Sequence, residues 1–114
     1  MKFKFEKNLR IINEIMTYLH KLGANDINVT FHTEDNSSSF LIWGHIKEID
    51  DIELYNLKKI LNTNRQHEVE EYYWNLGGEC ELEGELSLVG MMIDKAEISY
   101  NDSILSIKIY RADY

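Results

Sequence analysis

The strongest constraint on the fold is a pair of strand-like segments near the C-terminal end, with a very short polar turn between them. The segments EISY (97–100) and ILSIKIY (104–110) alternate apolar and polar side chains, and the chain turns tightly at Asn101-Asp102. Alternation with a period of two is typical of a strand that buries one face, and so short a turn joins antiparallel neighbours. The sequence therefore predicts a C-terminal β-hairpin.

A second pair of strand-like segments lies in the N-terminal half. DINVTFHT (26–33) alternates apolar and polar side chains, and SFLIWGHI (39–46) follows after a polar stretch. In the second of these strands both faces carry apolar groups, because Ile42 alternates with Leu41 and Trp43. We expect a second hairpin here.

Four segments show the spacing of three and four residues that is typical of amphipathic helices. They cover residues 8–23, 51–61, 67–76 and 85–94. The apolar stripe of the first helix consists of Leu9, Ile12, Ile15, Met16, Leu19 and Leu22. Asp50 with Glu53, and Thr63 with Gln66, have capping-box spacing, so each pair is expected to begin a helix.

The predicted order is helix, strand, strand, helix, helix, helix, strand, strand. Two hairpins and no required parallel crossover predict an α+β two-layer sandwich, with the helices on one face of a mainly antiparallel sheet. A chain of 114 residues is expected to form a single domain, residues 1–114. The uncovered face of the sheet would carry Thr30, His32, Ser99 and Lys108, together with the aromatic side chains of Trp43 and Tyr110.

Charge and composition exclude several classes of protein. Twenty acidic and twelve basic residues give a net charge of -8, which would repel a nucleic-acid backbone. No apolar run reaches the roughly 18 residues that span a bilayer, so we expect no membrane partner. The single cysteine, Cys80, forms no internal disulfide, and we see no secretory signal, so we expect a cytoplasmic protein.

The order of these elements resembles the ATPase domain of the GHKL superfamily, which includes histidine kinase catalytic domains and anti-sigma-factor serine kinases. The closest local likeness is LSLVGMMIDKAEISYNDSILSIKIYR (86–111), which resembles the second glycine box, helix and terminal hairpin of that family. The likeness in order covers residues 8–111. The resemblance implies an α+β fold and, in an intact member, an ATP site.

The residues that hold nucleotide in this family are mostly absent. Glu14 can take the place of the family's glutamate, but Tyr18 stands where an Asn should hold Mg²⁺, and tyrosine is a poor ligand for that cation. The first glycine motif reads WGHIK (43–47), and the second reads ELSL (85–88). The first motif keeps one glycine and lacks the family's Asp, and the second motif has no glycine. Where a glycine is missing, backbone N–H groups cannot approach phosphates closely. The resemblance therefore implies a degenerate site, and we expect no cofactor and no catalytic residue.

Two other groups contain residue types that can bind a metal ion or act as a nucleophile. His67 and Glu71 stand four residues apart on a predicted helix, so both could reach one metal ion, but no third ligand can be assigned. Exposed helical side chains explain the pair equally well. Cys80 lies among carboxylates, which disfavour the reactive thiolate. We expect neither a metal site nor a catalytic cysteine.

The leading functional hypothesis is a small, non-catalytic interaction or regulatory domain that binds a protein partner or a second copy of itself. Its candidate anchors are Trp43, Tyr110 and Trp74, because helical spacing in YYW (72–74) buries the two tyrosines and turns Trp74 outward. One alternative is a nucleotide-binding, GHKL-like ATPase or kinase domain that uses Glu14 as a base. The other is a small-ligand or metal-binding module.

Overall fold

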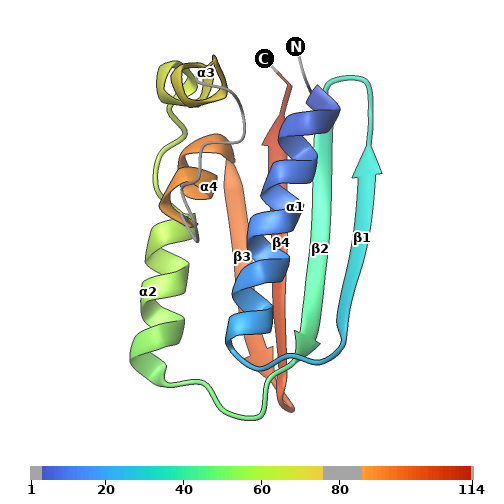
Figure 1. Ribbon diagram of the computed structural model, residues 1–114, viewed down its shortest axis with the longest axis vertical. Coiled ribbons are helices and arrows are strands. Elements are labelled where there is room, and N and C mark those ends of the chain that lie inside the picture. The colour runs from blue at the N-terminus through green and yellow to red at the C-terminus, as the bar shows by residue number, and fades with distance from the viewer. Residues whose placement is uncertain (1–3, 76–85, 114) are drawn as a thin grey trace.

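A four-stranded antiparallel sheet with helices on one of its faces forms the body of the protein (Figure 1). The computed structural model describes residues 4–75 and 86–113, with the backbone alone for residues 73–75. Fold class and element order both agree with the prediction of an α+β two-layer sandwich.

Along the chain, one helix and then three helices each precede a pair of strands. In order they are α1 (Lys4–Lys21), β1 (Ile27–Thr33), β2 (Ser37–His45), α2 (Asp51–Leu61), α3 (His67–Asn75), α4 (Leu86–Met92), β3 (Lys95–Asn101) and β4 (Ile104–Ala112). Within the sheet the strand order is β1-β2-β4-β3, and every neighbouring pair is antiparallel. The last strand of the chain therefore lies in the middle of the sheet, where it joins the two hairpins.

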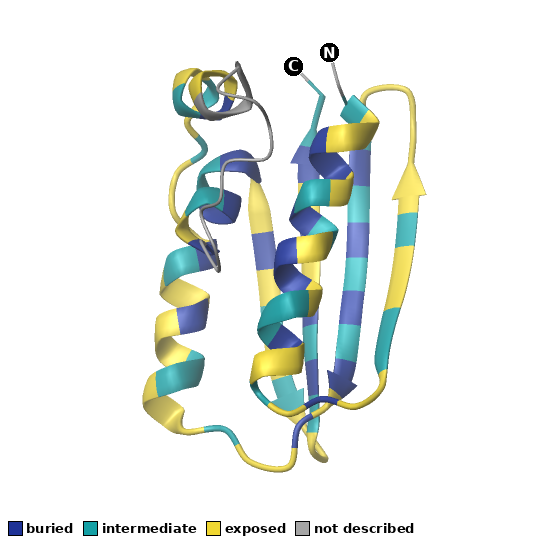
Figure 2. Cartoon of the chain, viewed as in Figure 1, coloured by how far each residue is buried: buried dark blue, intermediate teal, exposed yellow. Residues whose placement is uncertain are grey.

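The period-two alternation of β2 and β4 separates an inner face, which packs against the helices, from an outer face (Figure 2). The inner face of the two strands contains five apolar side chains that are at most 1% exposed: Phe40, Ile42, Leu105, Ile107 and Ile109. Helix α1 lies over this face and contributes the fully buried side chains of Ile11, Ile15 and Leu19. The apolar core thus fills one layer, between the sheet and the helices.

Helix α1 differs from its prediction in both its start and its buried stripe. It begins at Lys4, four residues before the predicted start, and it buries Ile11 while leaving Leu9 46% exposed and Met16 36% exposed. The buried face of α1 also includes the polar residues Lys7, Asn8 and Glu14. A prediction from apolar spacing could not find these polar residues. They are buried because part of the surface that α1 contacts is itself polar: Asn8 donates a hydrogen bond to the buried Ser38 hydroxyl.

Of the two predicted helix starts, the one at Asp50 is confirmed and the one at Thr63 is wrong. Asp50 precedes α2, but its side chain makes no capping hydrogen bond. The Thr63 hydroxyl donates to the carbonyl of Ile60 at 2.8 Å, so it closes the end of α2 and does not begin α3. A capping motif in a sequence can serve the helix on either side, and only the tertiary path decides which one.

The C-terminal hairpin turns one residue later than predicted. Asn101 still pairs with Ile104, and the two turn residues are Asp102 and Ser103, with φ of 52° and 63°. Two successive residues with positive φ are typical of the tight turn whose twist matches an antiparallel pair. The later turn leaves β3 and β4 paired along the whole of β3.

Candidate functional site

The outer face of the sheet carries both aromatic side chains that the alternation predicted there. Antiparallel register aligns the outer residues in three rows, Asn28–Trp43–Ser106–Ser99, Thr30–Leu41–Lys108–Glu97 and His32–Ser39–Tyr110–Lys95. Tyr110 is 45% exposed, and Trp43 is half-buried, with its ring edge-on to that of His45 at 6.1 Å between centroids. No helix lies over this side of the sheet in the described ranges (Figure 1). The two aromatic side chains are therefore open to a partner.

Charged side chains line a shallow hollow beside Tyr110 on this face. Lys95, Glu97, Lys108 and Tyr110 line a volume of about 330 Å³. Lys95 Nζ lies 3.1 Å from Glu97 Oε1, and this hydrogen bond and charge lower the pKa of Glu97. The three rows thus contain two lysines and one carboxylate, whereas the whole chain has a net charge of -8. The outer face is locally basic on an acidic protein.

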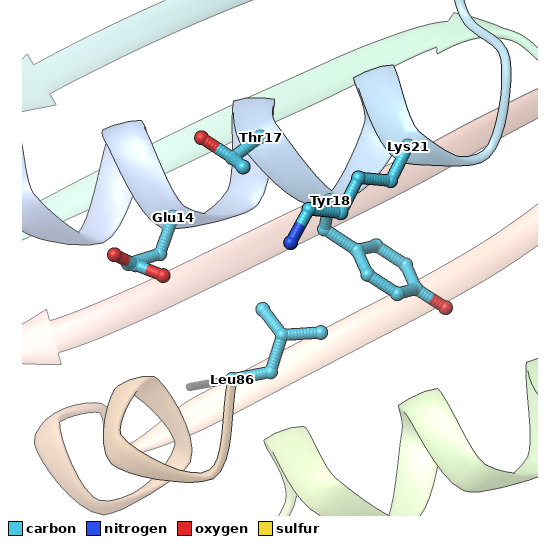
Figure 3. Close-up of a pocket in the computed structure, with 5 residues that line it drawn as sticks. All are labelled: Glu14, Thr17, Tyr18, Lys21 and Leu86. Atoms are coloured by element: carbon cyan, nitrogen blue, oxygen red, sulfur yellow. The ribbon is translucent and has the colours of Figure 1, made fainter. Parts of the chain in front are cut away.

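Glu14, the candidate that the family resemblance suggested, lines a second and much smaller pocket. Figure 3 shows Glu14, Thr17, Tyr18 and Lys21 on α1, with Leu86 pointing toward α1 from the start of α4. The Glu14 side chain is 11% exposed, and its Oε1 lies 3.3 Å from Arg10 Nε. Its other oxygen, Oε2, has no hydrogen-bond partner among the described residues.

The pocket beside Glu14 measures about 50 Å³, enough for water but far below the roughly 300 Å³ at which ligand pockets begin. Tyr18 does not face an ion there, because its hydroxyl donates to Glu53 Oε2 at 2.7 Å and so ties α1 to α2. Burial, followed by the hydrogen bond and the negative charge of Glu53, raises the pKa of Tyr18 well above its ordinary value. The described residues leave no room for a nucleotide beside Glu14.

The pair His67 and Glu71 lies on α3 as the spacing predicted, but Glu71 has another partner. Its carboxylate accepts a hydrogen bond from the Lys7 ammonium group, a cation that would compete with a metal ion. Within residues 4–75 and 86–113, no three His, Cys, Asp or Glu side chains are grouped as a metal site would require. The described geometry does not favour a metal at this pair.

Helix α3 also corrects the prediction made for YYW (72–74). Tyr72, which the spacing placed on the buried face, is 62% exposed. The side chains of Tyr73 and Trp74 lie outside the described residues, so the candidate anchor Trp74 stays a prediction. The reason for the error at Tyr72 is that α3 turns a carboxylate, Glu70, toward the body of the protein, and Glu70 is only 2% exposed.

Glu70 is the centre of a buried ionic cluster that the sequence analysis missed, formed with Lys7, Arg65 and Arg111 and named here the Glu70 cluster. Arg111 Nη1 and Nη2 donate to the two carboxylate oxygens of Glu70 at 3.0 and 2.9 Å. Lys7 Nζ donates to Oε2 at 3.0 Å, and Arg65 Nη2 donates to Oε1 at 3.4 Å. The side chains of Lys7 and Arg111 are fully buried. One carboxylate therefore receives hydrogen bonds from three cations.

Further polar groups complete the surroundings of the Glu70 cluster. Arg65 Nη1 also donates to Asp94 Oδ2 at 2.9 Å and to the carbonyl of Ala112 at 2.6 Å. Burial alone would raise the pKa of Glu70, but the hydrogen bonds and charge of Arg111, followed by the hydrogen bond from Lys7 and the charge of Arg65, outweigh burial and lower it. Glu70 is therefore held ionised in the folded protein.

One signal in the sequence could have indicated this cluster. The alternation of β4 that buries Leu105, Ile107 and Ile109 also places Arg111 on the inner face. An arginine at a core position requires a buried anionic partner, because an unpaired buried charge is very costly. Which of the twenty carboxylates serves as that partner cannot be read from the sequence, since Glu70 lies 41 residues away.

Comparison with known proteins found no match: no protein-family model matches the chain, and no curated protein matches it. None of the helices in the described ranges combines the length and apolar composition of a membrane span. Fold and site define an α+β sandwich with an open, locally basic sheet face and a buried ionic cluster beneath α3.

Proposed function

We propose that this protein is an interaction domain that binds a partner protein through the outer face of its sheet. The observation that supports this function is the position of Trp43 and Tyr110 on the sheet face that no described helix covers. Aromatic side chains are frequent anchors of protein interfaces, because they bury a large area and lose little conformational freedom on binding. A sheet that carries them beside a hollow is suited to such a contact.

The chemistry of this face indicates what kind of partner it binds. Leu41 and Trp43 provide an apolar centre, which is flanked on the neighbouring strands by Lys108 and by Lys95, the latter paired with Glu97, so that one positive charge is left in excess. Complementary charge favours a partner with an apolar contact surrounded by carboxylates. A second copy that docked face to face would bring two surfaces of the same net positive charge into contact. We therefore favour a different, acidic protein over a homodimer.

The first test identifies the partner from the face itself. A photo-crosslinking amino acid at position 110 or 41 should capture one protein, whereas the same probe at Tyr55 should not. Tyr55 is a matched control because it is 65% exposed but lies on α2, in the helical layer. Sedimentation equilibrium of the purified protein should show a monomer; a dimer that Trp43→Ala dissociates would make a second copy the partner.

The affinity of the captured partner for variants then decides the proposal. Trp43→Ala and Tyr110→Ala should each weaken binding by about 2 kcal/mol or more, roughly 30-fold, as hot-spot residues do. Lys108→Glu should weaken it most strongly at low salt, because it inverts a charge that faces the partner. Equal affinity for the wild type and both alanine variants, measured by calorimetry, would rule out this face as the binding site.

Nucleotide binding is the second candidate function, supported by the element order and by the buried Glu14 carboxylate with one oxygen unpaired among the described residues. A nucleotide at 100 times its dissociation constant would stabilise the fold by about 2.7 kcal/mol, a rise of several degrees in Tm. Because the pocket measures about 50 Å³, we expect no change with ATP or ADP, with or without Mg²⁺. A Mg²⁺-dependent rise that Glu14→Ala abolishes would favour this candidate instead.

A further inference from the structure

We propose that the backbone edge of β1 that faces away from β2, named here the β1 edge, is a site of strand addition. Its occupant is an extended segment of a partner protein that has basic residues at its ends. In the described ranges, β1 pairs with β2 on one side and with no strand on the other. The strand forms the right-hand border of the sheet in Figure 1. This site does not depend on the contact proposed for the outer face of the sheet.

The register of β1 determines which of its backbone groups point away from β2. Glu34 donates its backbone N–H to the carbonyl of Ser37 at 2.8 Å, and these two residues continue the β1–β2 register without a shift. Bonded and non-bonded pairs alternate in an antiparallel ladder. Thr30 therefore bonds to β2, whereas Val29 and Phe31 direct their N–H and C=O groups outward. A further strand is the structure that would pair these alternate groups in series.

The strand β1 lacks the features that usually protect an edge strand from pairing with another chain. Its sequence INVTFHT contains no Lys, Arg, Asp, Glu or Pro, and its pairing with β2 is continuous over all 7 residues, without a bulge. The strand at the opposite edge, β3, carries Lys95 and Glu97. An unprotected edge is a template on which a segment of another protein binds through main-chain hydrogen bonds.

Apolar side chains lie beside the β1 edge on the helical side of the sheet. Val29 is 38% exposed, and the ring of Phe31 lies 6.3 Å from that of Phe5 on α1, between centroids. Leu9 and Met16 follow Phe5 at helical spacing, so they lie on the same side of α1. These three side chains are between 36% and 57% exposed. An added strand would cover them with alternate apolar side chains and would direct its polar ones to the outer face.

Acidic side chains flank β1 at both ends. Three exposed carboxylates lie immediately before and after the strand: Asp26, Glu34 and Asp35. His45 lies 2.9 Å from the first of them and His32 lies 3.3 Å from the second, so each imidazole balances at most one carboxylate. Lys4 pairs with Asp113 at 2.7 Å and donates to the backbone carbonyl of Glu34. A negative charge therefore stays in excess, and complementary charge favours a segment with basic ends.

A second copy of the chain is a poorer occupant of the β1 edge. The longest antiparallel overlap of two β1 strands would place Asp26 of one copy opposite Glu34 of the other. Like charges directly opposite one another destabilise a strand pair. Each copy also carries a net charge of -8, which adds to the repulsion. We therefore assign the β1 edge to a different protein.

Hydrogen exchange at single backbone amides tests this assignment. In the protein alone, the amides of Val29 and Phe31 should be less protected than those of Thr30 and His32, which bond to β2. The probe is a peptide of alternating threonine and valine, with lysines at both ends and blocked termini. At saturation it should slow exchange at Val29 and Phe31 by about tenfold or more. Such a change would fill in the alternating pattern, as pairing along the whole edge requires.

Two methylated forms of the peptide provide a matched pair. Directly opposite residues in a sheet have their side chains on the same face, so the valines that cover the apolar side chains are the residues that bond to β1. N-methylation of the valines removes the donors that face β1 and should abolish binding. N-methylation of the threonines removes only donors on the far side and should leave binding intact.

A matched pair of protein variants gives a second measurement. Val29→Lys places a charge on the apolar side of the β1 edge and should weaken binding of the peptide by about tenfold or more. Thr30→Lys adds the same charge one residue further on, facing the outer face, and should change the affinity by less than about threefold. Fluorescence anisotropy of the labelled peptide measures both affinities.

Four results would contradict the proposal in different ways. Equal binding of the two methylated peptides would overturn strand addition, and so would amides of Val29 and Phe31 that stay unprotected at millimolar peptide. Protection at these amides that rises with protein concentration, without peptide, would make a second copy the occupant. A peptide with glutamates in place of the lysines should bind more weakly at low salt. Equal affinity of these two peptides would overturn the inference that the segment has basic ends.

Discussion

Replacement of Glu70 by glutamine is expected to lower the free energy of unfolding by about 3–5 kcal/mol, the range for removing one partner of a buried ion pair. The amide keeps the shape of the side chain but carries no charge, so the fully buried Lys7 and Arg111 lose their shared anion. The arginine fork would also face an amide N–H₂ group, which cannot accept its second hydrogen bond. Urea denaturation at pH 7 measures the loss.

The same variant should change how stability depends on pH. The folded-state pKa of Glu70 is lowered from its ordinary value of 4.5, so its stabilisation is complete above about pH 4.5 and is lost as the pH falls through the lower folded value. Hydrogen bonds from His45 and Lys95 also lower the pKa values of Asp26 and Glu97. The pH dependence of the wild type alone therefore does not give the contribution of Glu70. The difference between wild type and Glu70→Gln should therefore shrink on acidification.

Glu68→Gln is the matched control for this prediction, because Glu68 is exposed on the same helix. We expect it to change the free energy of unfolding by less than about 0.5 kcal/mol, as surface substitutions usually do. If Glu70→Gln were as mild as Glu68→Gln, the ion pairs of the Glu70 cluster would contribute no net stability to the fold.

Replacement of Phe40 by alanine should cost about 3–5 kcal/mol, the range for removing a buried aromatic side chain. Phe40 is 1% exposed on the inner face of β2, and its ring stacks on that of Phe31 at 5.1 Å between centroids. Its backbone neighbours in the sheet are Phe31 and Ile109, so the cavity would open at the centre of the core, where surrounding strands cannot easily close it. Guanidinium denaturation measures the loss.

Leu41 provides the control for Phe40, because it is the next residue on the same strand and points to the outer face. Leu41→Ala should cost clearly less than Phe40→Ala, since no helix among the described residues covers the outer face. Equal losses at both positions would mean that a second layer covers the outer face under the conditions of the assay. Repeating the measurement at several protein concentrations would then show whether that layer is another copy of the chain.

Much of the fold could be predicted from local patterns. Alternation identified the strands and placed Trp43, Tyr110 and Lys108 on one face, because successive side chains of any strand point to opposite sides. Helical spacing identified four helices in the correct order. It misjudged Ile11 and Tyr72, because the face that a helix buries depends on what packs against it, and here part of that surface is polar.

The candidate site was predicted only in part. The outer-face aromatics were found because their positions follow from alternation, whereas their role in binding is still a prediction. Glu14 was identified through the family resemblance, and its surroundings are too small for a nucleotide. The Glu70 cluster was not predicted, because the contacts of Glu70 with Arg111 and Lys7 join residues 41 and 63 positions apart.

The sequence by itself determined what depends on neighbours along the chain: the type and order of the elements, the two hairpins and the side of the sheet to which each strand residue points. Only the tertiary structure decided which strands meet, with β4 between β2 and β3, and which buried charges pair. The physical reason is that periodicity is a local property of the backbone, whereas the pairing of Glu70 with Arg111 is set by packing between segments far apart in the chain.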